Sequence, residues 1–250
     1  MMEHLPRTVE QIVEEHARRW REQQALGHGQ PRRPVLTISR QYGARGGELA
    51  RLLAERLGLR LLDREILQEV AHSAHLGEHA VQGLDDRDRA GLEDWLASLL
   101  AHDYISLSSY REHLTRVIGL ISWFGGAVIL GRGAHLILGP HQALRLMVVA
   151  PLAERVAEVR RREGLDERQA RRRISEVESE REAFLARHFH ARFGDPASFD
   201  LVVNSASLAL EEALEAVRGA LARRTFEPDP STYHDWSQVT HPAGMTLGRG

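Results

Sequence analysis

The chain contains no lysine and no cysteine, and each absence limits its chemistry. All 33 of its basic residues are arginine, in a sequence of 250 residues. Without cysteine the protein has no disulfide, no thiolate metal site and no cysteine nucleophile. Long hydrophobic runs are also missing, because the longest, such as residues 127–130 and 146–150, are far too short to span a bilayer.

Strong net charge is absent as well. The formal net charge is −2, so no global field draws the chain to nucleic acid or to an anionic membrane. The first residues, Met1 to His4, do not open a secretory signal. We therefore expect a cytoplasmic protein whose partners are small molecules, with no nucleic acid and no membrane among them, while a homo-oligomer stays open.

What the chain does have is a regular alternation of strand and helix patterns, which predicts a parallel α/β sheet. Several of the strand segments are continuously apolar, as expected where helices cover both faces of a sheet. Between them lie helical patterns, one of which ends at Gly58 and another at Gly164. The five expected strands are residues 34–39, 59–62, 127–130, 144–149 and 199–204.

The outer segments are predicted to lie apart from this sheet. Residues 9–24 have the apolar spacing of an amphipathic helix, and a Gly- and Pro-containing stretch follows at 27–31. We therefore divide the chain into an N-terminal helical extension at 1–30, a main domain at 34–224 and a flexible C-terminal tail at 225–250.

A glycine-rich segment, SRQYGARGGE at residues 39–48, follows the first expected strand and precedes a helix. In that order the helix dipole and its unpaired amides form an anion site, and glycines let the backbone approach a phosphate. A tight turn without a ligand is the alternative. The residues expected to bind the phosphates of a nucleotide are Ser39, Arg40, Gly43, Ala44, Gly46, Gly47 and Glu48.

This segment departs from the usual phosphate-binding loop, G-x-x-x-x-G-K-[ST], in two ways. It has no lysine for the β- and γ-phosphates, and Gly47 and Glu48 stand where a hydroxyl for Mg²⁺ would be. Either Arg45 or Arg40 supplies the positive charge, or the site binds without catalysing. Glu48 could approach Mg²⁺, but a carboxylate at a helix N-terminus is the reading we favour.

Four segments in order resemble the cytidylate kinase-like family of P-loop nucleoside monophosphate kinases. They are residues 37–43 (TISRQYG), 57–66 (LGLRLLDREI), 129–133 (ILGRG) and 199–205 (FDLVVNS). The resemblance covers residues 34 to 224 and rests on the order and spacing of these segments.

The resemblance implies a three-layer α/β fold with a five-stranded parallel sheet, a helical acceptor-binding insertion near 85–123 and a lid helix near 166–190. It also implies ATP and Mg²⁺ as donor and cofactor. True cytidylate kinases carry aspartate where this chain has Gly133, so we do not expect cytosine recognition to carry over.

By the same resemblance, Arg132 would hold the acceptor phosphate and Arg181 would belong to the lid, and with Arg45 they are the expected catalytic residues. A surface salt bridge for Arg132 and a solvated helix face for Arg181 are the alternatives. Asp63 would bind the acceptor or merely cap a helix. His72, His75 and His79 have a helical spacing, but no carboxylate pattern supports them, so we expect no protein metal site.

The sequence thus predicts an enzyme that transfers a phosphoryl group from ATP to a nucleoside monophosphate or a similar small acceptor. The alternative is a catalytically impaired nucleotide-binding regulatory module that lacks the lysine of the loop.

Overall fold

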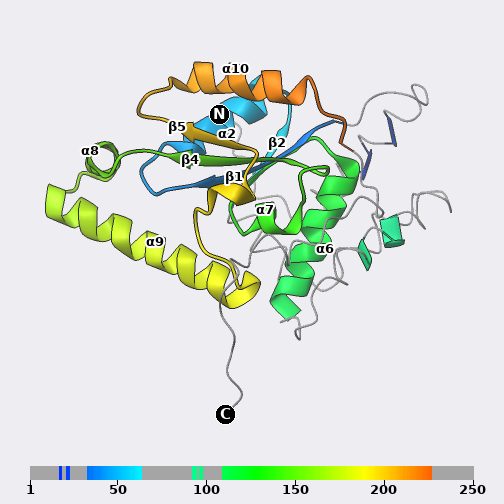
Figure 1. Cartoon of the computed structure of the whole chain (residues 1–250), viewed down its shortest axis with the longest axis horizontal. Helices are drawn as coiled ribbons and strands as arrows, with labels where there is room; N and C mark the ends of the chain where they lie inside the picture. The colour runs from blue at the N-terminus through cyan, green and yellow to red at the C-terminus, as the bar shows by residue number, and fades with distance from the viewer. Residues whose placement is uncertain are drawn as a thin grey trace, which may run out of the picture.

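The computed structural model describes residues 17–18, 21–22, 33–63, 92–94, 96–97 and 109–226. Within them, five strands form one parallel sheet in the spatial order β2-β3-β1-β4-β5 (Figure 1). The predicted α/β class and the five parallel strands are confirmed. The strands are β1 (Val35–Arg40), β2 (Arg60–Leu62), β3 (Ala127–Leu130), β4 (Leu144–Val149) and β5 (Leu201–Asn204).

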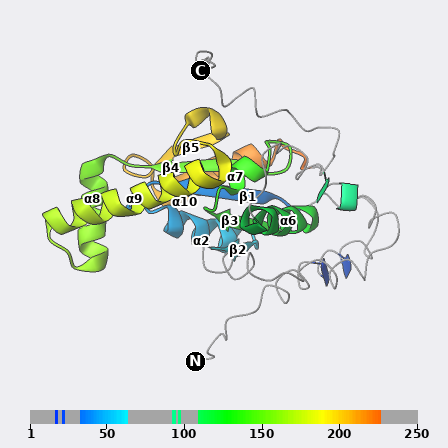
Figure 2. The same cartoon turned by 90° about the horizontal axis from the view of Figure 1, so that it is seen from below.

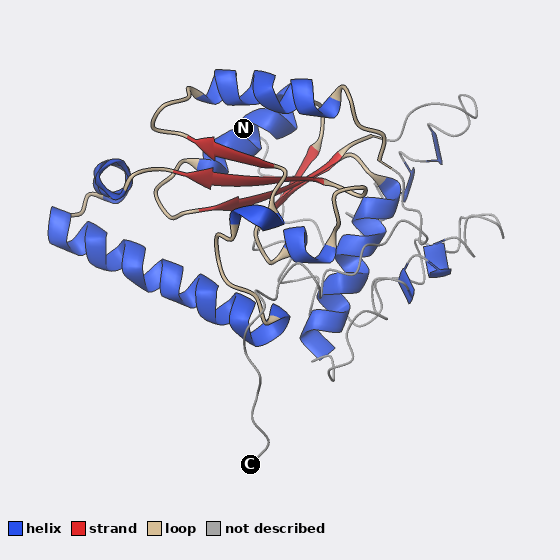
Figure 3. Cartoon of the chain, viewed as in Figure 1, coloured by secondary structure: helices blue, strands red, loops and turns tan. Residues whose placement is uncertain are grey.

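Helices cover both faces of this sheet and complete a three-layer arrangement. Figures 1 and 3 show α2 and α10 on one face, with α6 and α7 on the other. The α8–α9 pair extends beyond the sheet on the side toward which β4 and β5 point (Figures 2 and 3). The helices are α2 (Gly46–Arg56), α6 (Ser109–Phe124), α7 (Ala134–Ile137), α8 (Leu152–Glu163), α9 (Glu167–Phe189) and α10 (Leu210–Leu221), and a short 3₁₀ turn, η1, spans Pro196–Ser198.

Two apolar cores lie on the two faces of the sheet, because successive strand residues point to opposite sides. Leu36 and Ile38 of β1 pack into the core that contains α2 and α10, whereas Val35 packs into the core that contains α6 and α7. Ala127 and Ile129 of β3 belong to the second core in the same way. This two-sided burial is what the continuously apolar strands predicted.

The sheet opens a crevice at the carboxyl ends of β1 and β3. These strands are neighbours, with Ile38 opposite Leu130. The chain leaves β1 into α2 on one face and leaves β3 into α7 on the other. Adjacent strands whose connections diverge in this manner form the switch point at which open α/β sheets bind ligands.

Local chemistry sets the helix ends where the sequence predicted them. Gly58 and Gly164 have φ of 63° and 69° after α2 and α8, the left-handed conformation that favours glycine. Asp166 caps α9, since its side chain accepts a hydrogen bond from the Gln169 backbone N–H while the Gln169 side chain reaches back to the cap.

Several expectations fall outside the described residues. These are most of the N-terminal extension, the three histidines at 72, 75 and 79, the first part of the expected insertion and the C-terminal tail. The division into domains therefore stays a prediction. None of the helices above combines the length and hydropathy that crossing a bilayer requires.

Candidate active site

The glycine-rich segment forms an open turn between β1 and α2. Helix α2 begins at Gly46, and Arg45 before it has φ of 56°, while Gly43 has φ of 84°. Within the described part of the chain, the backbone N–H groups of Gly43, Gly46 and Gly47 donate to no protein acceptor. These amides and the dipole of α2 give the turn the chemistry of an anion site.

Neighbouring strands hold this loop in place. The Gln41 N–H donates to the carbonyl of Val148 at 3.0 Å, and the Gln41 side-chain oxygen accepts from the Ala150 N–H at 3.1 Å. Ser205, which follows β5, donates its hydroxyl to the carbonyl of Ala44 at 2.9 Å. A loop fixed from two sides is organised before any ligand arrives, which is the arrangement that favours tight and directional binding.

The α8–α9 pair is also fastened to the loop. Glu178 of α9 accepts from the Tyr42 N–H at 3.3 Å and from Arg155 of α8 at 2.7 Å. The Tyr42 hydroxyl donates to Glu163 at 2.6 Å. A Cβ added at Gly43 would lie 2.6 Å from the Arg155 carbonyl oxygen, so the loop passes α8 too closely for any side chain.

A cavity of about 500 Å³ lies on one side of the loop, between the sheet edge and α9. It brings together three guanidinium groups from three elements: Arg40 at the end of β1, Arg132 after β3 and Arg181 on α9. Arg181 also donates to the Arg40 carbonyl at 2.7 Å, which ties α9 to the loop. The other lining residues are Ser39, Leu130, Gly131, Gly133, His135, Glu180, Phe184, Leu185 and Phe193.

Arg132 sits in an unusual backbone turn. Gly131, Arg132 and Gly133 have φ of 87°, 56° and 69° in succession, and a non-glycine residue in that region stores strain of the kind that gathers at functional sites. The Arg132 guanidinium lies over the Phe184 ring, 5.1 Å from its centroid. A Cβ added at Gly133 would lie 2.5 Å from the Phe189 ring, so the place where cytidylate kinases carry aspartate is filled by an aromatic ring.

The floor of this cavity holds a serine–histidine pair. The Ser39 hydroxyl lies 3.1 Å from Nδ1 of His135, whose ring stacks on Phe199. Burial lowers the pKa of His135 to about 3, and the positive charge of Arg145 acts in the same direction. The imidazole is therefore neutral at physiological pH and offers one donor and one acceptor.

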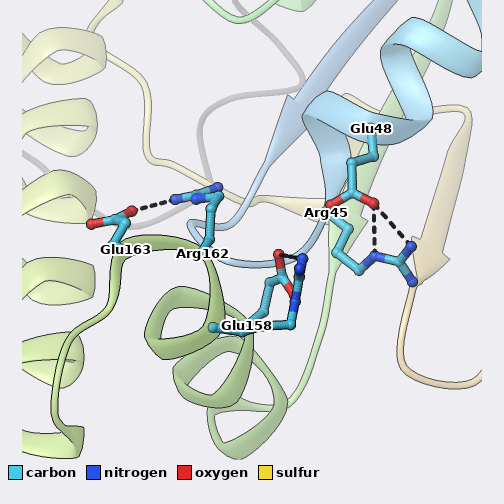
Figure 4. A network of polar contacts seen from close by, with 6 residues as sticks. Arg45, Glu48, Glu158, Arg162 and Glu163 are labelled. Carbon is cyan, nitrogen blue, oxygen red and sulfur yellow. Dashed lines mark hydrogen bonds and ion pairs between the residues drawn. The ribbon is translucent and has the colours of Figure 1, made fainter.

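A second cavity of about 430 Å³ lies on the other side of the loop. Gly43 and Arg45 line it from the loop, Ser205 from the turn after β5, and Glu158 from α8. Figure 4 shows that Arg45 points back to Glu48 on the first turn of α2, with Glu158 across from the pair. Arg45 donates to Glu48 twice, at 3.1 and 2.9 Å, so its charge is already partly neutralised.

The structure thus divides the predicted site residues between the two cavities. Ser39, Arg40, Arg132 and Arg181 line the first cavity, and Gly43 and Arg45 line the second. Ala44, Gly46 and Gly47 form the loop between them, and Glu48 is the ion-pair partner of Arg45. Asp63 directly follows β2, is partly buried and lines neither cavity.

Sequence reasoning missed several residues of the site. His135, Phe184 and Phe193 line the first cavity, and Tyr42 and Glu178 join the loop to α9. His135 had a local signal, since it lies three residues after Arg132 and just beyond the same glycine turn. The Tyr42–Glu178 contact had none, because 136 residues separate its members.

Comparison with solved structures shows the same fold in an uncharacterized protein, and two kinases align more weakly. An uncharacterized protein from Eubacterium ventriosum aligns with a TM-score of 0.58 and 19% identity, covering 77% of this chain and all of that one. Shikimate kinases from Bacteroides thetaiotaomicron and from Acinetobacter baumannii, the latter in complex with shikimate, align with TM-scores of 0.42 and 0.39 and identities of 12% and 13%. These alignments cover 76% of this chain and 98% and 93% of the kinases.

The sequence comparisons give one partial relative and one family. A uronate isomerase from Corynebacterium glutamicum is 32% identical over 115 residues, which is 46% of this chain and only 22% of that protein. The match therefore spans about a fifth of the length of the curated relative. The model of the cytidylate kinase-like family matches residues 35–207, which contain the loop, the Gly131–Gly133 turn, the α8–α9 pair and β5. The chain belongs to the cytidylate kinase-like family.

Proposed function

We propose that the protein transfers a phosphoryl group from ATP to a nucleoside monophosphate or a similar small anionic acceptor. The observation that carries this proposal is the placement of the glycine loop between two cavities, of about 430 and about 500 Å³. Phosphoryl transfer needs two ligands whose reacting ends meet, and a phosphate-binding loop between two ligand spaces supplies that arrangement.

The donor would occupy the loop and the second cavity. The amides of Gly43, Gly46 and Gly47 face no protein acceptor within the described residues, and any Cβ at Gly43 would collide with Arg155. A turn with unpaired amides and no side chain in the way fits a phosphate group. Arg45 would neutralise charge on this donor side once its contact with Glu48 loosens.

The acceptor would occupy the first cavity, where Arg132 and Arg181 converge. Guanidinium groups bind phosphate oxygens in pairs and with fixed geometry. The Phe184 ring lines this cavity beside Arg132 and offers a surface for a flat or apolar acceptor group, and the rings of Tyr110 and His188 pack against it from behind. Tyr110 lies on α6, within the segment expected to form the acceptor insertion.

In the proposed reaction the bond between the γ-phosphorus and the β–γ bridging oxygen breaks, a bond to an acceptor oxygen forms, and ADP leaves. Arg132 and Arg181 would stabilise charge on the transferred oxygens, and the pinned loop would hold the donor in line. Among the described residues, no three acidic or histidine side chains gather as a metal site. Mg²⁺ bound to the nucleotide would supply positive charge to its phosphate oxygens.

The test is to mix the purified protein with ATP, Mg²⁺ and each of a panel of nucleoside monophosphates, and to follow ADP. We expect ADP release that depends on one acceptor class. The Arg132→Gln variant should lose at least about tenfold in kcat/KM, since a charged hydrogen bond to the transferred group contributes about 1.5–3 kcal/mol. ADP release that does not depend on any acceptor would contradict the proposal. So would a kcat/KM for ADP release that is the same in Arg132→Gln as in the wild type.

The second candidate function is a nucleotide-binding regulatory module without turnover. The observation in its favour is that Gly46 and Gly47 occupy the start of α2, where the usual loop has lysine and a hydroxyl residue. The same experiment separates the two, because a module would bind ATP in calorimetry and release no ADP with any acceptor.

A further inference from the structure

The glycine loop aligns position by position with the usual phosphate-binding motif, but two of its positions carry different residue types. In G-x-x-x-x-G-K-[ST] the lysine begins the helix and the second glycine precedes it. Helix α2 begins at Gly46, and Arg45 before it has φ of 56°, a conformation that favours glycine. This register places Gly46 at the lysine position and Arg40 at the position of the first glycine, five residues before Arg45.

These two positions lie side by side in the folded loop. A Cβ added at Gly46 would lie 2.5 Å from the Cβ of Arg40 and 3.0 Å from its Cγ. The stem of Arg40 therefore occupies the space in which a side chain at position 46 would begin. A residue with a long side chain at one position excludes one at the other.

The far end of the Arg40 side chain reaches the acceptor side of the site. A Cβ added at Gly131 would lie 2.5 Å from Nη1 of Arg40. Its guanidinium thus lies beside the turn that carries Arg132, and both residues line the first cavity. Arg40 spans from the start of α2 to the end of β3, across the crevice where the two ligands would meet.

Arg45 has a different placement, although it is closer to the start of the helix. It donates twice to Glu48 in the first turn of α2, and its side chain is 41% exposed. It lines the second cavity rather than the first. Of the two arginines in the loop, only Arg40 lies between the loop and the acceptor cavity.

We propose that Arg40 is the phosphate-binding cation of this site, and that the chain has exchanged the glycine and lysine positions of the usual loop. The cation comes from the end of β1 rather than from the first turn of α2, and Gly46 and Gly131 lack side chains because Arg40 passes over both. The ligand group is the terminal phosphates of a nucleoside triphosphate, so the inference rests on the proposed function and names the residue that replaces lysine.

The choice of arginine has a consequence for geometry. A guanidinium presents a planar fork and can contact two phosphate oxygens, whereas a lysine ammonium is a point charge. The main-chain carbonyl of Arg40 accepts from Arg181 at 2.7 Å, so Arg40 also holds the arginine of α9 beside the loop. Arg40→Lys is therefore expected to lose binding nearly as fully as Arg40→Gln, despite keeping its charge.

The test measures binding of ATP and of inorganic triphosphate, each with Mg²⁺, by isothermal titration calorimetry. Arg40→Gln should weaken both by about tenfold or more, because it removes charge-assisted hydrogen bonds. Arg56→Gln is the matched control, since Arg56 is an exposed arginine in the last turn of the same helix. It should stay within about twofold of the wild type, as exposed charges contribute little.

The reciprocal variant is the sharper experiment. Gly46→Lys alone should bind poorly, because its side chain meets Arg40, whereas the double variant Arg40→Gly with Gly46→Lys should recover most of the lost affinity. Thermal melting identifies variants that fold. A folded double variant that binds no better than Arg40→Gln would overturn the inference, as would Arg40→Gln that binds like the wild type.

Different results would overturn the role of Arg40 and the proposed function. If the wild type binds ATP and triphosphate but Arg45→Gln rather than Arg40→Gln loses affinity, the assignment of Arg40 is overturned and the proposed function stands. If the wild type binds neither probe, the proposed function fails and the assignment fails with it.

Discussion

An ion pair with buried side chains, Arg145–Asp200, acts on His135, which lines the first cavity. Arg145 of β4 donates to both carboxylate oxygens of Asp200, at 3.1 and 3.0 Å, and both side chains are less than one-tenth exposed. The charge of Arg145 adds to burial in keeping His135 neutral. A neutral imidazole beneath Ser39 leaves the positive charge of the cavity to its arginines.

The neutral state of His135 predicts a pH-dependent stability. Burial lowers its pKa from 6.5 to about 3 in the fold, so between these values the unfolded chain binds a proton that the folded chain does not. Stability therefore falls as pH drops from 6.5 toward 3, by about 1.4 kcal/mol per pH unit for one proton. His135→Asn should remove this contribution to the pH dependence of the unfolding free energy. Urea unfolding at a series of pH values from 7 to 4 measures it.

The matched control is Ser39→Ala, which removes the hydrogen-bond partner of His135 but keeps the titrating ring. Its stability should therefore depend on pH as that of the wild type does. An identical pH dependence of stability in His135→Asn and the wild type would show that the fold does not lower the pKa of this histidine.

The Arg145–Asp200 pair predicts a large cost for removing one charge. Burial raises the pKa of Asp200, but hydrogen bonds and charge from Arg145, with Arg224 3.3 Å away, hold it below its ordinary value. The carboxylate contributes stability above the pKa it has in the unfolded chain, and that contribution is lost as pH falls through the lowered folded pKa. Asp200→Asn should cost about 3–5 kcal/mol, because it leaves Arg145 buried without its counter-charge.

Chemical denaturation at pH 7 measures this cost. Glu112→Gln is the control, since Glu112 pairs with Arg116 on the exposed surface of α6, where ion pairs contribute about 0–1 kcal/mol. If Asp200→Asn and Glu112→Gln lowered the free energy of unfolding equally, the Arg145–Asp200 pair would contribute no more than an exposed ion pair.

The glycine loop is the element on which the site depends, and α8 and α9 hold it as firmly as the sheet does. Glu178 bridges the Tyr42 backbone and Arg155, which is 9% exposed. Three guanidinium groups, from Arg162, Arg173 and Arg181, lie over the Tyr42 ring, 5.0 to 5.9 Å from its centroid. The helix pair is thus fastened to the glycine loop through Tyr42.

This coupling predicts that weakening one contact loosens the loop. Glu178→Gln keeps an acceptor but removes the charge that Arg155 contacts, so the amide of Tyr42, which donates to this side chain, should exchange hydrogen faster, with a loss of about 1–3 kcal/mol in local stability. Hydrogen exchange followed by mass spectrometry measures the exchange rate in the loop.

The control for this variant is Glu176→Gln on the same helix, because Glu176 pairs with the exposed Arg172. Exchange in the loop that is as fast in the control as in Glu178→Gln would contradict a specific coupling.

At the scale of the whole molecule, the sequence predicted the fold better than the site. Strand composition and helix caps are local signals, so the five strands and the ends at Gly58, Gly164 and Asp166 followed from short segments. Arg132 and Arg181 were named from a family resemblance, and both line the first cavity. The division of Arg40 and Arg45 between two cavities was not predictable, because it depends on a contact of Arg40 with Gly131, which lies 91 residues along the chain.

The claim on which the account depends is that this lysine-free loop holds the phosphates of a nucleotide. Titration of the full chain with ATP and Mg²⁺ in a calorimeter tests it most directly. We predict saturable heat at one site per chain, with competition by inorganic triphosphate and weaker binding in Arg40→Gln. No heat from any purine or pyrimidine triphosphate, with magnesium present and the protein folded, would contradict it.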